Sequence, residues 1–150
     1  MSELSAEPMY AGEFSRNLDA KNRVAVPSRW RFEGDDRDVF LAWYNKKDAC
    51  VTVFPPAKTL LLREKLKNLK TGNDKARRLI RELFGKASQF GCDAQGRIKL
   101  DDRLVDSAGI DKTATLVGNG DHFEIWSSDR YTALEEEEFD VLDAMDELDI

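Results

Sequence analysis

Apolar residues along the chain follow two spacings, and stretches of one kind alternate with stretches of the other. Alternation with a period of two predicts strands, and a period near 3.6 predicts helices. In the first half we expect strands at residues 12–16, 24–26, 39–44 and 50–54, and in the second half at 87–92, 98–100, 113–117 and 123–126. A helical turn at 27–32 and a short helix capped by Asp101 or Asp102 and ended by Gly109 follow the second strand of each half.

Two helices are predicted between the halves. Pro55 and Pro56 end the fourth strand and begin the first helix, and residues 71–74 break the pattern before a second helix begins near Lys75. Residues 58–86 hold ten basic and three acidic side chains. The middle of the chain is therefore predicted to be a basic helical hairpin that links two β-rich halves.

One five-residue pattern occurs twice in similar surroundings. Asp19 and Arg23 frame the first copy, and Asp93 and Arg97 frame the second, 74 positions later. In both copies the Asp follows a partly apolar run, Ala comes next, and the Arg opens a predicted strand. A third Asp-x-x-x-Arg, at residues 74–78, lies in a predicted helix without these flanks and shows how easily the bare pattern arises. The matched flanks predict an internal duplication.

Each copy has the composition of a tight turn. Asn22 and Gly96 occupy the same place, where a positive φ is expected. The Asp can accept hydrogen bonds from turn amides or pair with the Arg, which would hold the guanidinium ready for a phosphate or a guanine edge. The residues alone leave an alternative open, in which both pairs are surface salt bridges worth about 0 to 1 kcal/mol that only join the hairpins.

The net charge of −6 is unevenly distributed. Residues 135–150 contain nine acidic side chains and no basic one, which leaves 20 acidic against 23 basic side chains in the body. Phe139, Leu142, Met145 and Leu148 recur at a spacing of three, so we expect an amphipathic helix that continues from Tyr131. This tail either docks on the basic hairpin or competes with DNA, or it is a solubilising end.

Several classes of protein are disfavoured by composition. Cys50 and Cys92 lack metal-ligand spacing and are expected to be packing residues, and His122 is the one histidine. We find no Ser-His pairing, phosphate loop, bilayer-spanning apolar run or signal peptide. The expectation is a cytoplasmic protein that is not an enzyme and has no cofactor, metal, small-molecule substrate or membrane partner.

The flanking motifs resemble one bacterial family. The segments YAGEF and LDAKNRVAVP in the first half, and CDAQGRI, AGI, LVG and FEIW in the second, are similar to the MraZ regulators of the division and cell-wall gene cluster. The likeness covers residues 9–131. Asn22 stands where the family usually has Gly, and Asp101 where it usually has Pro. The N-terminal leader and the length of the acidic tail are not hallmarks of this family.

The resemblance implies an α+β, β-dominated fold: a duplicated AbrB-like swapped-hairpin pseudo-dimer. It also implies a ring-shaped homo-oligomer on the nucleoid that binds tandem promoter repeats, including its own, as a transcriptional regulator. The expected divisions are a flexible leader (1–8), a first repeat (9–56), a helical linker (57–86), a second repeat (87–134) and an acidic tail (135–150).

The expected DNA contacts lie mainly in the first half, where the basic side chains cluster around the motif. They are Arg16, Lys21, Arg23, Arg29 and Arg97, with Asp19 and Asp93 orienting the motif arginines. Trp30, Phe54 and Trp126 are interpreted as core or subunit-interface residues rather than base-stacking platforms. The alternative function is an oligomeric protein-interaction scaffold without specific DNA binding.

Overall fold

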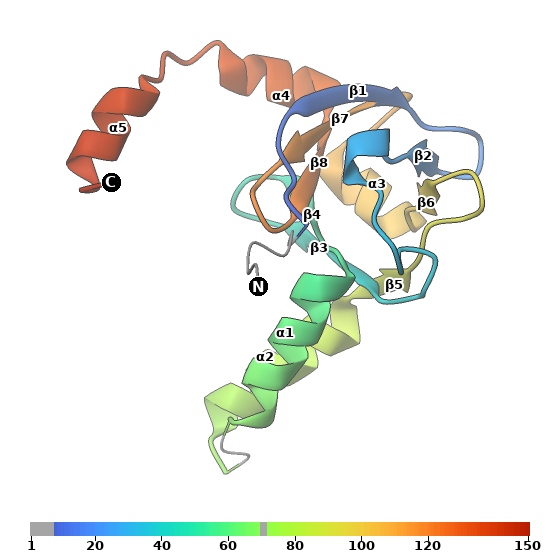
Figure 1. Ribbon diagram of the computed structural model, residues 1–150, viewed down its shortest axis with the longest axis vertical. Helices are drawn as coiled ribbons and strands as arrows, with labels where there is room; N and C mark the ends of the chain where they lie inside the picture. Colours follow the sequence, from blue (N-terminus) through green and yellow to red (C-terminus); the bar gives the residue numbers. More distant parts are fainter. Residues whose placement is uncertain (1–7, 70–71) are drawn as a thin grey trace, which may run out of the picture.

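The computed structural model describes residues 8–69 and 72–150 as an α+β, β-rich fold (Figure 1). The strands are β1 (Glu13–Asn17), β2 (Arg23–Ala25), β3 (Phe40–Asn45), β4 (Cys50–Phe54), β5 (Ser88–Phe90), β6 (Arg97–Lys99), β7 (Thr113–Gly118) and β8 (Phe123–Ser127). The helices are the 3-10 turn η1 (Ser28–Trp30), α1 (Pro56–Lys67), α2 (Asp74–Lys86), α3 (Asp102–Ala108), α4 (Ser128–Glu135) and α5 (Val141–Glu147). All the predicted strands are present, as are the predicted helices up to Tyr131, and the fifth strand is shorter than expected. Apart from Pro8, the predicted leader lies outside the described residues.

The large sheet interleaves the two halves of the chain. Its six antiparallel strands run in the order β1-β7-β8-β4-β3-β5, so the first strand of each half pairs with the third strand of the other. At the centre, β4 pairs with β8, and Thr52 lies opposite Glu124, 72 positions later. The strand order reads the same from either edge once each strand is replaced by its counterpart in the other half.

A second, two-stranded sheet repeats this relation. β2 and β6 are antiparallel, and Val24 lies opposite Ile98, its counterpart 74 positions later. Both side chains are fully buried. Each fully buried aliphatic side chain contributes about 1.5 to 3 kcal/mol relative to exposure. The small sheet is therefore joined to the fold by its buried face as well as by its own hydrogen bonds.

An aromatic cluster closes the core beside β1. Trp30 is 1% exposed, and its ring lies 5.1 Å from the rings of both Phe14 and Phe123. Its indole N–H donates to the carbonyl of Ala11. Trp126 is also buried and Phe54 is half-buried, so none of the three aromatic residues singled out from the sequence is a free stacking platform.

The helix ends follow local sequence signals. The side chain of Asn73 accepts from the amides of Lys75 and Ala76 at the start of α2, and that of Asp101 accepts from Leu104 at the start of α3. Gly109 ends α3 with a left-handed φ of 67°. The predicted cap and stop of α3 are confirmed.

The helical hairpin α1–α2 extends away from the sheet (Figure 1). The indole N–H of Trp43 on β3 donates to the carbonyl of Leu83 over 2.6 Å, which ties α2 to the sheet. Several large apolar side chains of the hairpin remain exposed: Leu60, Leu61, Leu79 and Phe84.

The prediction of one helix continuing from Tyr131 into the tail was wrong. α4 ends at Glu135, and α5 begins only at Val141 (Figure 1). Residues 135–138 are four consecutive glutamates, whose mutual repulsion disfavours a continued helix. The carboxylate of Asp140 then caps a new helix by accepting from the amide of Asp143.

Within residues 8–69 and 72–150, no helix is both long and apolar enough to cross a membrane.

Two glycine substitutions test the close contact between Gly118, at the end of β7, and Tyr10. A Cβ on Gly118 would lie 2.4 Å from the carbonyl oxygen of Tyr10, whereas one on Gly85 in α2 would meet nothing within 4 Å. We expect Gly118→Ala to lower the free energy of unfolding by about 1 to 3 kcal/mol. Gly85→Ala is the matched control and should raise it by about 0.5 to 1 kcal/mol, because Gly weakens a helix interior. Urea titrations measure both, and equal effects would contradict the packing at Gly118.

Candidate nucleic-acid interface

The two Asp-x-x-x-Arg segments form the same turn. In the first, the amide of Asn22 donates to the Asp19 carbonyl over 3.0 Å, and in the second the amide of Gly96 donates to the Asp93 carbonyl over 2.9 Å. Asn22 has φ 60° and Gly96 has φ 75°, which confirms the left-handed conformation predicted for both positions. Asn tolerates this region better than most residues with a side chain.

One carboxylate holds each turn and its arginine together. Oδ1 of Asp19 accepts from the amides of Lys21 and Arg23, both at 2.9 Å, and Oδ2 accepts from Nε of Arg23 at 2.6 Å. Oδ1 of Asp93 accepts from the amides of Gln95 and Arg97, and its Oδ2 accepts from Nε of Arg97, all at 2.9 Å. The two motifs match bond for bond, so each guanidinium is oriented by an aspartate that is itself fixed by the backbone.

These hydrogen bonds keep both carboxylates ionised. Bonds from the Arg23 amide, the Arg23 side chain and the Lys21 amide lower the pKa of Asp19 from 3.8 to about 2. The pKa of Asp93 is lowered in the same way, chiefly by the amide of Arg97. At neutral pH each motif is therefore a charged pair whose members are about one-third exposed.

The fold places the two turns side by side. The amide of Val26 donates to the carbonyl of Gly96, and the amide of Leu100 donates to the carbonyl of Asn22, each over 3.0 Å. Nη1 of Arg97 lies 3.9 Å from Oδ2 of Asp19. Five of the predicted site residues are thereby gathered in one place: Asp19, Lys21, Arg23, Asp93 and Arg97.

Arg16 and Arg29 lie on neighbouring elements. The guanidinium of Arg16, on β1, lies 5.4 Å from the centre of the Phe14 ring, and it also donates to the carbonyl of Ser15. Arg29 is exposed on η1, next to the buried Trp30. In the described part of the chain no hydrogen bond or ion pair joins either of them to the motif turns.

Each turn is also braced by a side chain from the other half, which the sequence did not indicate. The side-chain amide of Asn22 donates to Asp102 over 2.6 Å. Arg31 donates from Nε to the Val26 carbonyl, and its guanidinium lies so close to Gly96 that a Cβ there would be 2.3 Å from Cζ. No local pattern links residues this far apart, so these contacts could be found only from the fold.

Cysteine, histidine and acidic side chains form no catalytic or metal site within residues 8–69 and 72–150. Burial raises the pKa of the Cys50 and Cys92 thiols to about 12, which makes both poor nucleophiles at neutral pH. His122 contacts Asn119 and Asp121 at the turn between β7 and β8. Among the described residues, no three His, Cys, Asp or Glu side chains are grouped as metal ligands would be.

Comparison with known proteins places the duplicated motifs in a family. The chain is 33% identical over 145 residues to a protein of Clostridium acetobutylicum named "Transcriptional regulator MraZ", covering 95% of this chain and 100% of that protein. The chain belongs to the MraZ family. Proteins of the same name from Pseudomonas savastanoi pv. phaseolicola and Carboxydothermus hydrogenoformans are 37% identical over 128 residues and 36% identical over 121 residues. These matches cover 84% and 81% of this chain, and 85% and 82% of the relatives.

The family's own sequence model, described as "MraZ protein, putative antitoxin-like", matches residues 83–148. This match includes the second motif, and it also extends through most of the acidic tail. The tail therefore lies within the region that MraZ proteins share, although the resemblance seen in the sequence ended at residue 131. The names of the relatives describe regulators of transcription and not enzymes.

The shifted pKa of Asp19 gives a pH test of the motif turn. Because the folded-state value, about 2, lies below the usual 3.8, this carboxylate stabilises the folded chain above about pH 4. That contribution is lost as the pH falls from about 4 to about 2. Carbon-detected NMR of the side-chain carboxyl should give a midpoint near 2, and Asp19→Asn should reduce the pH dependence of stability in this window. A midpoint near 3.8 would contradict the hydrogen bonds described.

Proposed function

We propose that this chain is a sequence-specific DNA-binding regulator of transcription that contacts promoter DNA through its paired motif turns. The observation that supports this most is that the two turns have the same hydrogen bonds. They lie side by side, and each presents an oriented, partly exposed arginine. A structural salt bridge alone needs neither the duplication of this geometry nor the pairing of the two copies.

Orientation of the arginines favours recognition of DNA. A guanidinium held through Nε keeps its fork in one plane, so less side-chain entropy is lost when it meets a guanine edge or a phosphate. Arg23 and Arg97 are proposed to make such contacts, and Asp19 and Asp93 to orient them. Lys21, Arg16 and Arg29 are proposed to contact phosphates, which fix the position of a protein on the duplex.

The larger assembly is part of the same proposal. The strand order is interleaved, and β2 and β4 each pair with their own counterpart in the other half, β6 and β8. Both features support a duplicated AbrB-like swapped-hairpin pseudo-dimer, with repeats at 9–56 and 87–134. We infer a ring-shaped homo-oligomer that binds tandem repeats in the promoters of the division and cell-wall gene cluster, including its own. Such a protein would act in the cytoplasm, on the nucleoid, without catalysis or a cofactor.

One observation favours the alternative of a protein-interaction scaffold. The exposed apolar side chains of the α1–α2 hairpin, including Leu61 and Leu79, are typical of a surface that contacts protein. Subunits of the proposed oligomer would cover the same surface, so this observation does not require a different function. Binding to promoter DNA separates the two proposals.

Truncation of the motif arginines tests DNA binding directly. We expect Arg23→Ala to weaken binding to DNA from upstream of the gene at least about tenfold, because one well-placed arginine contact is worth about 1 to 3 kcal/mol. Arg97→Ala should also weaken binding to this DNA. Fluorescence anisotropy over a series of salt concentrations measures the affinity, and its logarithm should fall steeply with the logarithm of salt.

The third Asp-x-x-x-Arg supplies the matched control. Arg78 has the same sequence spacing from Asp74 but lies exposed in α2, so Arg78→Ala should leave the affinity nearly unchanged. Circular dichroism should show that all three variants remain folded. Equal losses for Arg23→Ala and Arg78→Ala, or an affinity that does not respond to salt, would count against reading of DNA by the turns and in favour of a scaffold.

A further inference from the structure

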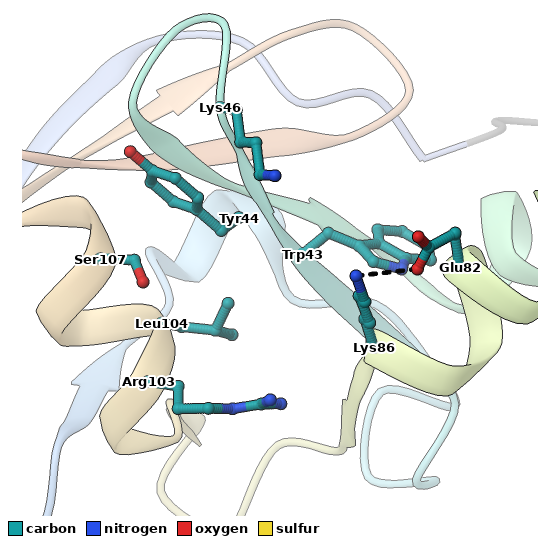
Figure 2. Close-up of a pocket in the computed structure, with 8 residues that line it drawn as sticks. All are labelled: Trp43, Tyr44, Lys46, Glu82, Lys86, Arg103, Leu104 and Ser107. Carbon is teal, nitrogen blue, oxygen red and sulfur yellow. Dashed lines mark ion pairs between the residues drawn. The ribbon is translucent and has the colours of Figure 1, made fainter.

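A groove on the body of the protein combines an apolar floor with a basic rim. It lies between β3, α2 and α3, has a volume of about 370 Å³ and is distinct from the motif turns (Figure 2). Trp43, Tyr44 and Leu104 form its apolar part. The indole N–H of Trp43 is already bonded to the Leu83 carbonyl, so this side chain presents its ring rather than a hydrogen-bond donor.

Positive charge dominates the rim of this groove. Three basic residues line it: Lys46, directly after β3, Lys86 on α2 and Arg103 on α3. Glu82 is the one acidic residue among the lining side chains, and it is paired with Lys86 at 2.9 Å. The groove therefore fits a ligand that has an apolar face and acidic flanks.

The tail helix α5 has this chemistry. On a helical projection, Val141, Leu142, Met145 and Leu148 fall on one side, and Asp140, Asp143, Asp146 and Glu147 fall on the other. Leu142 is 72% exposed and Leu148 is 70% exposed. Within residues 8–69 and 72–150, no hydrogen bond or ion pair joins α5 to the body. A short helix with a bare apolar side needs a partner to be stable in water.

We propose that α5 of one chain docks in this groove of a second copy, with its apolar side on Trp43 and Leu104 and its carboxylates beside Lys46, Lys86 and Arg103. This is the mode in which an amphipathic helix inserts side chains at i, i+3 and i+4 into a groove. The occupant is a second copy because α4 and the linker that follows it direct α5 away from α2 and α3 of the same chain (Figure 1).

The docking shares with the proposed regulator only the need for self-association. It requires neither the ring shape nor DNA. Light scattering on the protein without added oxidant reports whether copies associate at all, so failure of assembly can be told apart from failure of docking at this groove.

Disulfide trapping tests the contact in the full-length protein. One copy carries Met145→Cys and a second, longer-tagged copy carries Ser107→Cys on the α3 side of the groove, and the two are co-expressed and mildly oxidised. We expect a covalent heterodimer well above the background given by the native Cys50 and Cys92 in the unsubstituted chains. Pairing Met145→Cys with Lys65→Cys, an exposed position on α1 outside the groove, is the matched control and should stay at background.

Two further variants make the result specific. Leu142→Asp in the Met145→Cys chain should lower the heterodimer yield at least about fivefold, because an unpaired carboxylate would enter the apolar part of the groove. Arg103→Glu in the Ser107→Cys chain should lower the yield for electrostatic reasons. The proposal is overturned if the heterodimer stays at background. It is also overturned if a chain that carries both Met145→Cys and Ser107→Cys forms the disulfide only within itself.

Discussion

The structure of the motif region depends on one carboxylate in each turn. Asp19 accepts two backbone amides and its own arginine, and Asp93 does the same in the second copy. Two amides on one oxygen set the turn, and the turn sets the direction in which β2 and β6 leave it. Because the arginine bonds to the other oxygen, the backbone conformation and the side-chain orientation are coupled. Neither can change without disturbing the other.

The duplication becomes structure through pairing between the halves. Val24 faces its counterpart Ile98, and Thr52 faces its counterpart Glu124, although the two registers correspond to offsets of 74 and 72 residues. The offset changes within the β3–β4 and β7–β8 hairpins, because Ala42, opposite Val53, and Leu116, opposite Ile125, are still 74 positions apart. Both central pairings therefore keep their two-fold relation. Each half lends its first strand to the other, and neither half could complete the six-stranded sheet alone.

Local sequence signals predicted nearly all the elements of the fold. The positive φ at Asn22, the cap at Asp101 and the stop at Gly109 were all predicted, because each depends on residues within a few positions. Periodicity could not predict the pairing of β1 with β7, since partner choice depends on the whole sheet. The prediction of a single tail helix was wrong because it rested on apolar spacing alone. It left out the mutual repulsion of the four glutamates at 135–138. The fold brings the two motif turns side by side, and their spacing in the sequence could not predict this.

The two turns are alike in backbone but differ in their surroundings. The first is braced by the acidic Asp102 through Asn22, whereas the second, at Gly96, is covered by the guanidinium of Arg31 from the first half. Arg31 is only eight positions after Arg23 in the sequence, but the fold places its guanidinium over the second turn. The basic cluster is therefore shared between the turns rather than confined to the first half. Gly96 is required at this place for two reasons: its φ of 75° and the absence of a side chain beneath Arg31. At the first turn, Asn22 adopts the same left-handed conformation with φ 60°, and its side-chain amide donates to Asp102.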